Sequence, residues 1–135
     1  MKLSVKTMKQ QIDTDKSAPA LGPYSKGIDT GQFIFLSGQL GFDISGQLAG
    51  DDIETQTATA LNNIAAVLEA AGLDLGNIVK CQVFMTDLGD FSRMNAVFEE
   101  VFKPFGTYPA RAAFGVAALP KGALIELDVI AAREL

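Results

Sequence analysis

The fold is decided by residues 51–72, which read DDIETQTATALNNIAAVLEAAG. The apolar side chains of this stretch recur at the three- and four-residue spacing of one helix face, and they are Ile53, Leu61, Ile64, Ala65, Leu68 and Ala71. Asp51 followed by Glu54 has the spacing of a capping box, so we predict that a helix begins with Asp51 as its N-cap. Gly72 suits the left-handed conformation in which helices often end. An amphipathic helix of this kind needs an apolar surface to cover.

The segments on either side of this helix have the composition of β-strands. Strands are predicted over residues 8–12, in a hairpin over residues 28–36 with its turn at Gly31, and over residues 78–86, 110–118 and 123–132. In the third of these segments, alternation puts Val79, Cys81, Val83 and Met85 on one face. These strands supply the apolar surface that the helix requires.

A second helix is predicted after Asp90, which is a candidate N-cap. Its apolar stripe consists of Met94, Val97, Phe98, Val101 and Phe102, and the helix is expected to end near Pro104. The complete order, β-β-β-α-β-α-β-β, predicts a single α+β domain over residues 1–135, with a sheet of about six strands and two helices on one face. Two helices cover one face only, and the other face carries apolar residues such as Phe84. We therefore predict that this second face packs against other copies of the chain.

The composition excludes several classes of function. The chain has no histidine, so Ser-His-Asp, Cys-His and histidine-ligated zinc chemistry are ruled out. The net charge is −5 and the eleven basic residues are spread along the chain, which argues against nucleic-acid binding. Cys81 is the one cysteine, and its position in an apolar strand indicates an inert core thiol in a reducing compartment. The chain shows neither a signal-peptide pattern nor an apolar run of membrane-spanning length, so we expect a cytoplasmic protein.

Two charged residues interrupt otherwise apolar strands. Arg111 lies within YPARAAFGV (residues 108–116), and Glu126 lies within GALIELDVIAA (residues 122–132). An unpaired charge in such a strand costs several kcal/mol, so the pattern predicts a small polar pocket in an apolar wall. The alternative is a structural ion pair between Arg111 and either Glu126 or Asp128. Glu126 is a candidate general base toward water, and the alternative for it is a solvated strand face.

Three further positions are candidates for ligand contact. Tyr24 lies in the rigid segment Gly22-Pro23-Tyr24-Ser25, which holds its ring in a defined place or merely caps the core. Ser37, followed by Gly38, offers a hydroxyl or backbone donor, or only ends a strand. Asn95 lies next to a buried position of the second helix, where most asparagines face solvent.

Taken together, these segments resemble the reactive-intermediate deaminase family, RidA/YjgF, also called the endoribonuclease L-PSP family. The matching stretches are APALGPYS (residues 18–25), LSGQ (36–39), IETQT (53–57), ALNNI (60–64), VKCQVFMTDL (79–88), Asp90-Phe91 with Met94-Asn95, PAR (109–111) and LPKGALIE (119–126). The resemblance implies a chorismate-mutase-like α+β fold with a mixed sheet, assembled as a homotrimer with clefts between subunits. It also implies hydrolysis of reactive 2-enamine and 2-imino acids, such as 2-aminoacrylate, to 2-keto acids and ammonia, with neither cofactor nor metal.

The resemblance also implies roles for individual residues. Arg111 corresponds to the residue that holds the substrate carboxylate, and Glu126 to the one that positions or activates water. Tyr24, Ser37, Gly38 and Asn95 correspond to residues lining the same cleft. Ala113 corresponds to a further substrate-binding position, where many members have cysteine, and the alanine puts thiol chemistry in doubt here. The alternatives are a non-catalytic trimer that senses small carboxylates, and a ribonuclease or translation inhibitor.

Overall fold

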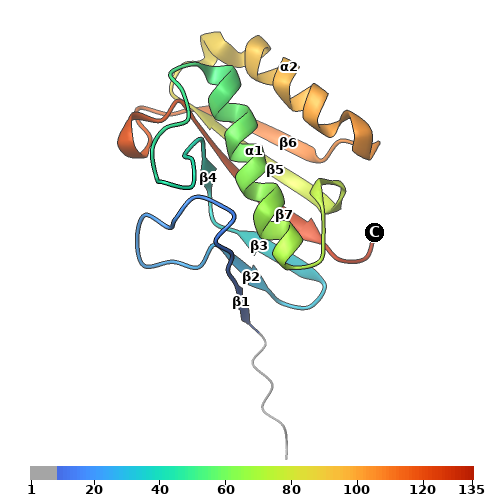
Figure 1. The fold of residues 1–135 in the computed structure, drawn as a ribbon. Helices are drawn as coiled ribbons and strands as arrows, with labels where there is room; N and C mark the ends of the chain where they lie inside the picture. Colours follow the sequence, from blue (N-terminus) through green and yellow to red (C-terminus); the bar gives the residue numbers. More distant parts are fainter. Residues whose placement is uncertain (1–8) are drawn as a thin grey trace, which may run out of the picture.

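The computed structural model describes residues 9–135, and within them one mixed sheet is covered on one side by two helices (Figure 1). The strands are β1 (Gln10–Ile12), β2 (Gly27–Asp29), β3 (Phe33–Leu36), β4 (Gln39–Leu40), β5 (Ile78–Met85), β6 (Ala110–Gly115) and β7 (Ile125–Ala132). The helices are α1 (Ile53–Ala70) and α2 (Phe91–Phe102), with short 3-10 turns η1 (Leu75–Asn77), η2 (Leu88–Asp90), η3 (Lys103–Phe105) and η4 (Pro120–Gly122). The predicted α+β class and the placement of both helices on one face are confirmed.

The sheet has the strand order β1-β2-β3-β7-β5-β6, and β4 pairs with β7 beside this path. Strands β5 and β6 are parallel, whereas the other pairs are antiparallel. About six strands were expected, and the residues described form seven. The additional strand is β4, whose two residues pair with Leu127 and Glu126. The two residues of β4 are too few to show an alternating pattern, so the sequence does not predict this strand.

Helix α1 begins one residue later than predicted. Its N-cap is Asp52, whose side chain accepts a hydrogen bond of 2.8 Å from the backbone N–H of Thr55. The prediction of Asp51 as N-cap is therefore wrong, and the two consecutive aspartates explain the ambiguity. The helix ends as expected, because Gly72 has φ +78°. Its apolar stripe is buried against the sheet, as the zero exposure of Ile64 and Leu68 shows.

Strand β5 departs from simple alternation at its start. Cys81, Val83 and Met85 are buried on the helix side, as predicted. Val79 is 38% exposed, so its assignment to that face is wrong. The register against β7 shifts between Ile78 and Lys80, which makes Val79 the extra residue of a bulge. Ile78 takes the buried place instead.

Helix α2 follows Asp90, but Asp90 makes no side-chain capping hydrogen bond and pairs with Arg93 instead. Met94, Phe98 and Phe102 form its buried stripe, with Val97 and Val101 half-buried at its sides. Phe98 and Phe102 stack with their ring centroids 4.4 Å apart. This packing fixes the face of α2 that looks toward β6.

The other face of the sheet has no covering layer within the described chain. Phe33 and Phe35 of β3 are each 44% exposed there, and Phe84 of β5 stacks on Phe114 of β6 with ring centroids 5.6 Å apart. Aromatic residues at this density are unusual on a surface that faces water. Assembly with further copies stays a prediction that this open face motivates. Within residues 9–135, neither helix combines the length and apolar composition that a membrane crossing requires.

Candidate functional site

Arg111 projects from the helix-covered face of the sheet. In the parallel pairing of β6 with β5 it lies beside Cys81, which is buried under the helices. Its guanidinium carbon lies 4.8 Å from the ring centroid of Phe98 and 5.5 Å from that of Phe91, so both α2 rings make cation–π contacts with it. One guanidinium nitrogen also lies 3.9 Å from the sulfur of Met94. The aromatic rings hold the cation in place without neutralising it.

Arg111 has no counter-ion among residues 9–135, because the ion pairs found there involve other side chains. The alternative of a structural ion pair with Glu126 or Asp128 is therefore wrong. A half-buried guanidinium has five N–H donors, and here none of them donates to an oxygen of residues 9–135. Such a group is suited to bind an anion brought in from outside.

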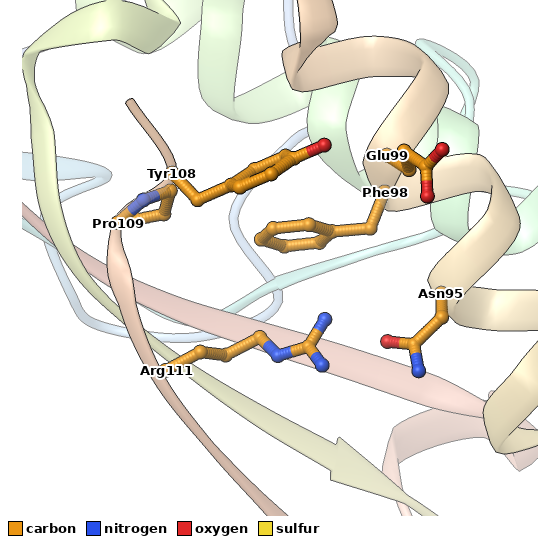
Figure 2. A pocket seen from close by; sticks show the side chains of 6 residues that line it. All are labelled: Asn95, Phe98, Glu99, Tyr108, Pro109 and Arg111. Atoms are coloured by element: carbon orange, nitrogen blue, oxygen red, sulfur yellow. The ribbon is translucent and has the colours of Figure 1, made fainter. Parts of the chain in front are cut away.

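A cavity of about 370 Å³ opens beside Arg111. Its lining consists of Asn95, Phe98, Glu99, Tyr108, Pro109 and Arg111 (Figure 2). Figure 2 shows the amide of Asn95 and the guanidinium of Arg111 facing each other at the base of this space. The side-chain oxygen of Asn95 is buried and has no hydrogen-bond partner among the described residues. Asn95 thus lines a cavity, contrary to the alternative that it faces solvent.

Glu126 projects from the opposite face of the sheet. Glu126 of β7 pairs with Phe84 of β5, so both side chains lie on the same face of the sheet. Phe84 alternates with Val83 and Met85, which are buried on the helix side. Arg111 and Glu126, although they lie on strands that share β5 as a neighbour, are therefore separated by the sheet itself. The expectation of one pocket holding both charges is not met within a single chain.

A second cavity, of about 480 Å³, lies on the Glu126 side of the sheet. It is lined by Leu21, Tyr24, Ser37, Gly38, Leu40, Pro120 and Glu126. The carboxylate of Glu126 rests against Gly38, where an added β-carbon would lie 2.8 Å from the carboxyl carbon. Four of the predicted site residues are thus brought together here: Tyr24, Ser37, Gly38 and Glu126.

The environment of Glu126 makes it a stronger base than an ordinary glutamate. Burial raises the pKa of Glu126, and the negative charge of Asp128 raises it further. Burial also raises the pKa of Asp128. A carboxylate with a raised pKa takes a proton from water more readily, which is the property that a general base needs.

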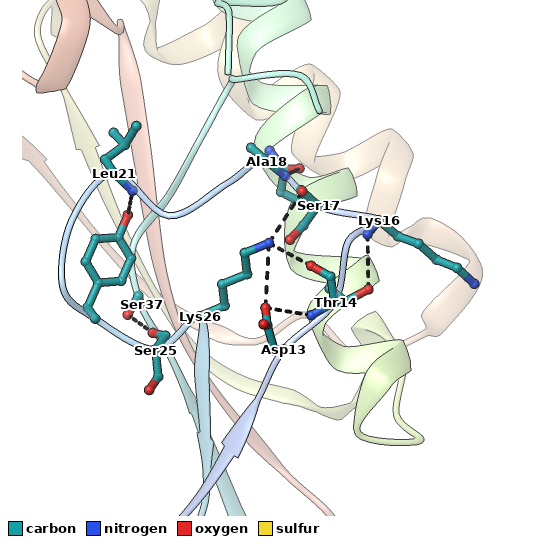
Figure 3. Close-up of polar contacts among 11 residues, drawn as sticks. Asp13, Thr14, Lys16, Ser17, Ala18, Leu21, Ser25, Lys26 and Ser37 are labelled. Atoms are coloured by element: carbon teal, nitrogen blue, oxygen red, sulfur yellow. Dashed lines mark hydrogen bonds and ion pairs between the residues drawn. The ribbon is translucent and has the colours of Figure 1, made fainter. Parts of the chain in front are cut away.

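The loop that carries Tyr24 is held by hydrogen bonds at several points (Figure 3). The Tyr24 hydroxyl accepts a bond of 2.9 Å from the N–H of Leu21, and the Ser37 hydroxyl donates one of 2.6 Å to the carbonyl of Ser25. The proton of the Ser37 hydroxyl is therefore already committed to the backbone. Ser37 positions the loop in this structure, and its hydroxyl keeps only acceptor capacity for a ligand.

Two polar residues that the sequence did not single out, Lys26 and Asn63, anchor this loop from inside. Lys26 is a buried residue, and its ammonium donates a 2.7 Å hydrogen bond to the carbonyl of Thr14. Asn63 of α1 accepts from the N–H of Ala18 at 2.9 Å and donates to the carbonyls of Leu40 and Phe42 at 3.0 and 2.9 Å. An asparagine between Leu61 and Ile64 was the available signal, because an amide beside an apolar helix face needs partners.

Ala113 and Cys81 are part of the hydrophobic core or pack against it. Ala113 lies beside Val83 on the Arg111 side of the sheet, packs against the hydrophobic core, and is not among the residues that line the two cavities. Cys81 is fully buried, and burial raises the pKa of its thiol to about 12. A thiol in that environment stays protonated and inert, as the sequence predicted.

The fold and these two cavities define an α+β protein in which one cavity is lined by a guanidinium without a counter-ion among residues 9–135, and the other by a carboxylate whose pKa is raised. The chain belongs to the Endoribonuclease L-PSP family, whose model matches residues 15–133, and this confirms the resemblance to RidA/YjgF. The 2-iminobutanoate/2-iminopropanoate deaminase of Bos taurus is 44% identical over 90% of this chain and 88% of its own length. The enzyme of the same name from Salmonella typhimurium is 41% identical over 93% and 99%, respectively. The family function that these relatives support is imine deamination.

Solved structures agree with this assignment. The crystal structure of E. coli TdcF with bound serine matches with a TM-score of 0.90 and 39% identity, over 93% of this chain and all of that one. The structure of the E. coli yjgF gene product matches with a TM-score of 0.89 and 40% identity, over 93% of this chain and 99% of that one.

Proposed function

We propose that this protein hydrolyses small reactive 2-enamine and 2-imino acids of the 2-aminoacrylate/2-iminopropionate type, releasing a 2-keto acid and ammonia. The observation that carries this proposal is the Arg111 guanidinium, which stacks on Phe91 and Phe98, opens onto a cavity, and lacks a counter-ion among residues 9–135. A planar guanidinium in that state suits the carboxylate common to these substrates.

The complete site requires two copies of the chain. Arg111 and Asn95 open on one face of the sheet, whereas Glu126, Gly38 and Tyr24 open on the other. A homotrimer with clefts between neighbours joins the Arg111 cavity of one protomer to Glu126 of the partner subunit. The exposed aromatic side chains of the open face support such an assembly, because it removes them from water.

In this proposal Arg111 holds the carboxylate and so fixes the adjacent C=N carbon near a water molecule. Glu126 accepts a proton as the water oxygen bonds to that carbon and the π electrons move to nitrogen. The resulting carbinolamine takes the proton back on nitrogen. The C–N bond then breaks, its electron pair leaves with ammonia, and the hydroxyl proton passes to the Glu126 carboxylate as the carbonyl forms. An enamine enters the sequence after a proton is added to its carbon.

The demands on such a site are modest. Imines hydrolyse in water unaided, and every tenfold acceleration requires about 1.4 kcal/mol. Orientation of the substrate by one guanidinium and deprotonation of water by one carboxylate can together supply several tenfold accelerations. The relatives named 2-iminobutanoate/2-iminopropanoate deaminase support this chemistry, and the serine-bound TdcF structure supports a small amino-acid-like carboxylate as ligand.

The test couples the protein to a serine dehydratase that releases 2-aminoacrylate, and follows keto-acid formation. Wild-type protein should accelerate this step, and Arg111→Ala should abolish the acceleration. Arg93→Ala is the matched control, because Arg93 is an arginine of α2 that already pairs with Glu54 and Asp90. An Arg111→Ala protein as fast as the wild type would overturn the proposal. Saturable binding of 2-keto acids without any turnover would instead support the carboxylate sensor.

A further inference from the structure

The cavity beside Arg111 contains one carboxylate that the proposed reaction does not use. Glu99 lies one helical turn after Asn95 on α2 and lines the same cavity. Figure 2 shows its carboxylate above Asn95, on the side of the cavity toward which the Tyr108 hydroxyl points. Glu99 is exposed and takes part in none of the ion pairs among residues 9–135. Its negative charge is therefore free to act on whatever enters the cavity.

Few charged residues line the two cavities. Arg111 is the one cation among the residues that line the first cavity, and Glu99 is the one anion. The lining of the second cavity holds Glu126 and no cation. An incoming ligand thus meets a single positive group and negative groups on both sides. Once a carboxylate occupies Arg111, these linings offer no partner to a second one.

We propose that Glu99 is a specificity-determining residue that makes the site select monocarboxylates and reject dicarboxylates. This inference rests on the proposed function, because it assumes that Arg111 binds the substrate carboxylate. Like charges a few ångströms apart at a partly solvated site repel enough to weaken binding by about three- to tenfold. The reactions that supply the substrate are accordingly eliminations from amino acids with uncharged side chains. Imines that carry a second carboxylate on the side chain are disfavoured by the same factor of about three to ten.

The experiment compares 2-hydroxybutanoate with malate, which have the same four-carbon 2-hydroxy acid skeleton and differ by a second carboxylate in place of the terminal methyl group. Binding of both acids is titrated by NMR to the wild-type protein, Glu99→Gln and Glu100→Gln. Glu100 is the matched control, because it is the next residue of α2, is exposed, and is not among the residues lining the cavity. Each substitution removes one negative charge from the same turn of the helix.

Wild type should prefer the monocarboxylate, and Glu99→Gln should reduce that preference about three- to tenfold by tightening malate binding. The reduction should shrink at high salt, because the repulsion is screened. An unchanged preference in Glu99→Gln, or an equal change in Glu100→Gln, overturns the role of Glu99. Arg111→Ala separates this failure from failure of the proposed function. If 2-hydroxybutanoate binds Arg111→Ala as well as the wild type, both proposals fall together.

Discussion

The carboxylate of Glu126 occupies the space that a side chain at Gly38 would need: a β-carbon added there would lie 1.8 Å from the Oε2 oxygen of Glu126. The contact is with the far end of a flexible side chain, so a larger residue at position 38 displaces Glu126 without disturbing the backbone. Gly38 is therefore required by the position of a functional side chain, and its φ angle is not one of those that favour glycine.

We expect Gly38→Ala to lower imine hydrolysis about 100-fold, because a catalytic group displaced by about 1 Å loses that much. The melting temperature should remain close to that of the wild type. Gly22→Ala is the control, since a β-carbon at Gly22 would make only an ordinary 3.8 Å contact with the ring of Tyr24. Full activity in Gly38→Ala would show that Glu126 need not lie where the structure has it.

The acidic limb of the pH–rate profile should reflect the protonation of the Glu126 carboxylate. Because the pKa of Glu126 is raised, the active carboxylate form is lost at a higher pH than for an ordinary glutamate. Asp128→Asn removes the neighbouring negative charge that contributes to this shift, so the acidic midpoint should move to lower pH. A midpoint that stays in place in Asp128→Asn would contradict this account. The measurement is the rate of the dehydratase-coupled assay with the protein limiting.

The same two carboxyls predict how stability depends on pH. Raised pKa values mean that the folded chain binds more protons than the unfolded chain between the ordinary and the raised values. The contribution of Glu126 and Asp128 to folding is therefore fully present below the ordinary pKa values and is lost as the pH rises through the raised ones. Asp128→Asn should increase the free energy of unfolding at neutral pH, as measured in urea. A decrease would indicate that Asp128 has a stabilising partner in the assembled protein.

Two inactive variants should restore activity when mixed, if the site lies between copies. Arg111→Ala keeps Glu126, and Glu126→Gln keeps Arg111, so a mixed cleft recovers both groups. Random exchange in an equimolar mixture rebuilds about a quarter of the clefts, because each of the two required groups is intact in half of the chains. The measurement is activity after unfolding and refolding the two proteins together. If mixed oligomers form and no activity returns, the active site does not combine Arg111 of one chain with Glu126 of another.

Asn63 should contribute more to stability than any of the candidate catalytic residues. Asn63→Ala leaves two buried carbonyls and one N–H without partners, and should lower the free energy of unfolding by about 2–4 kcal/mol. Asn62→Ala is the matched control, because Asn62 is exposed on the same helix turn and should tolerate alanine or gain slightly from it. Urea denaturation of both variants checks this difference. Equal unfolding free energies would mean that the loop anchored by Asn63 does not limit stability.

The features that depend on neighbours in the chain were readable from the sequence. The stripe of α1 and the left-handed exit at Gly72 follow from helical periodicity and from the backbone freedom of glycine. The core position of Cys81 follows from alternation within one strand. The errors within the sheet arose where a distant strand decides the pairing. Strand β4 exists through its pairing with β7, and Val79 turns outward because the register with β7 shifts there.

The candidate site also has features that the sequence predicts and features that only the tertiary structure determines. Sequence alone was sufficient to single out Arg111 and Glu126, because a charge in an apolar strand stands out wherever that strand lies. The sequence did not determine that the two side chains leave the sheet on opposite faces, since this depends on how β6 and β7 are each registered against β5. Periodicity is a local property of a strand, whereas the face that a residue presents is set by hydrogen bonds to strands far away in the chain. Tertiary structure therefore decided that one chain holds two separate halves of the proposed site.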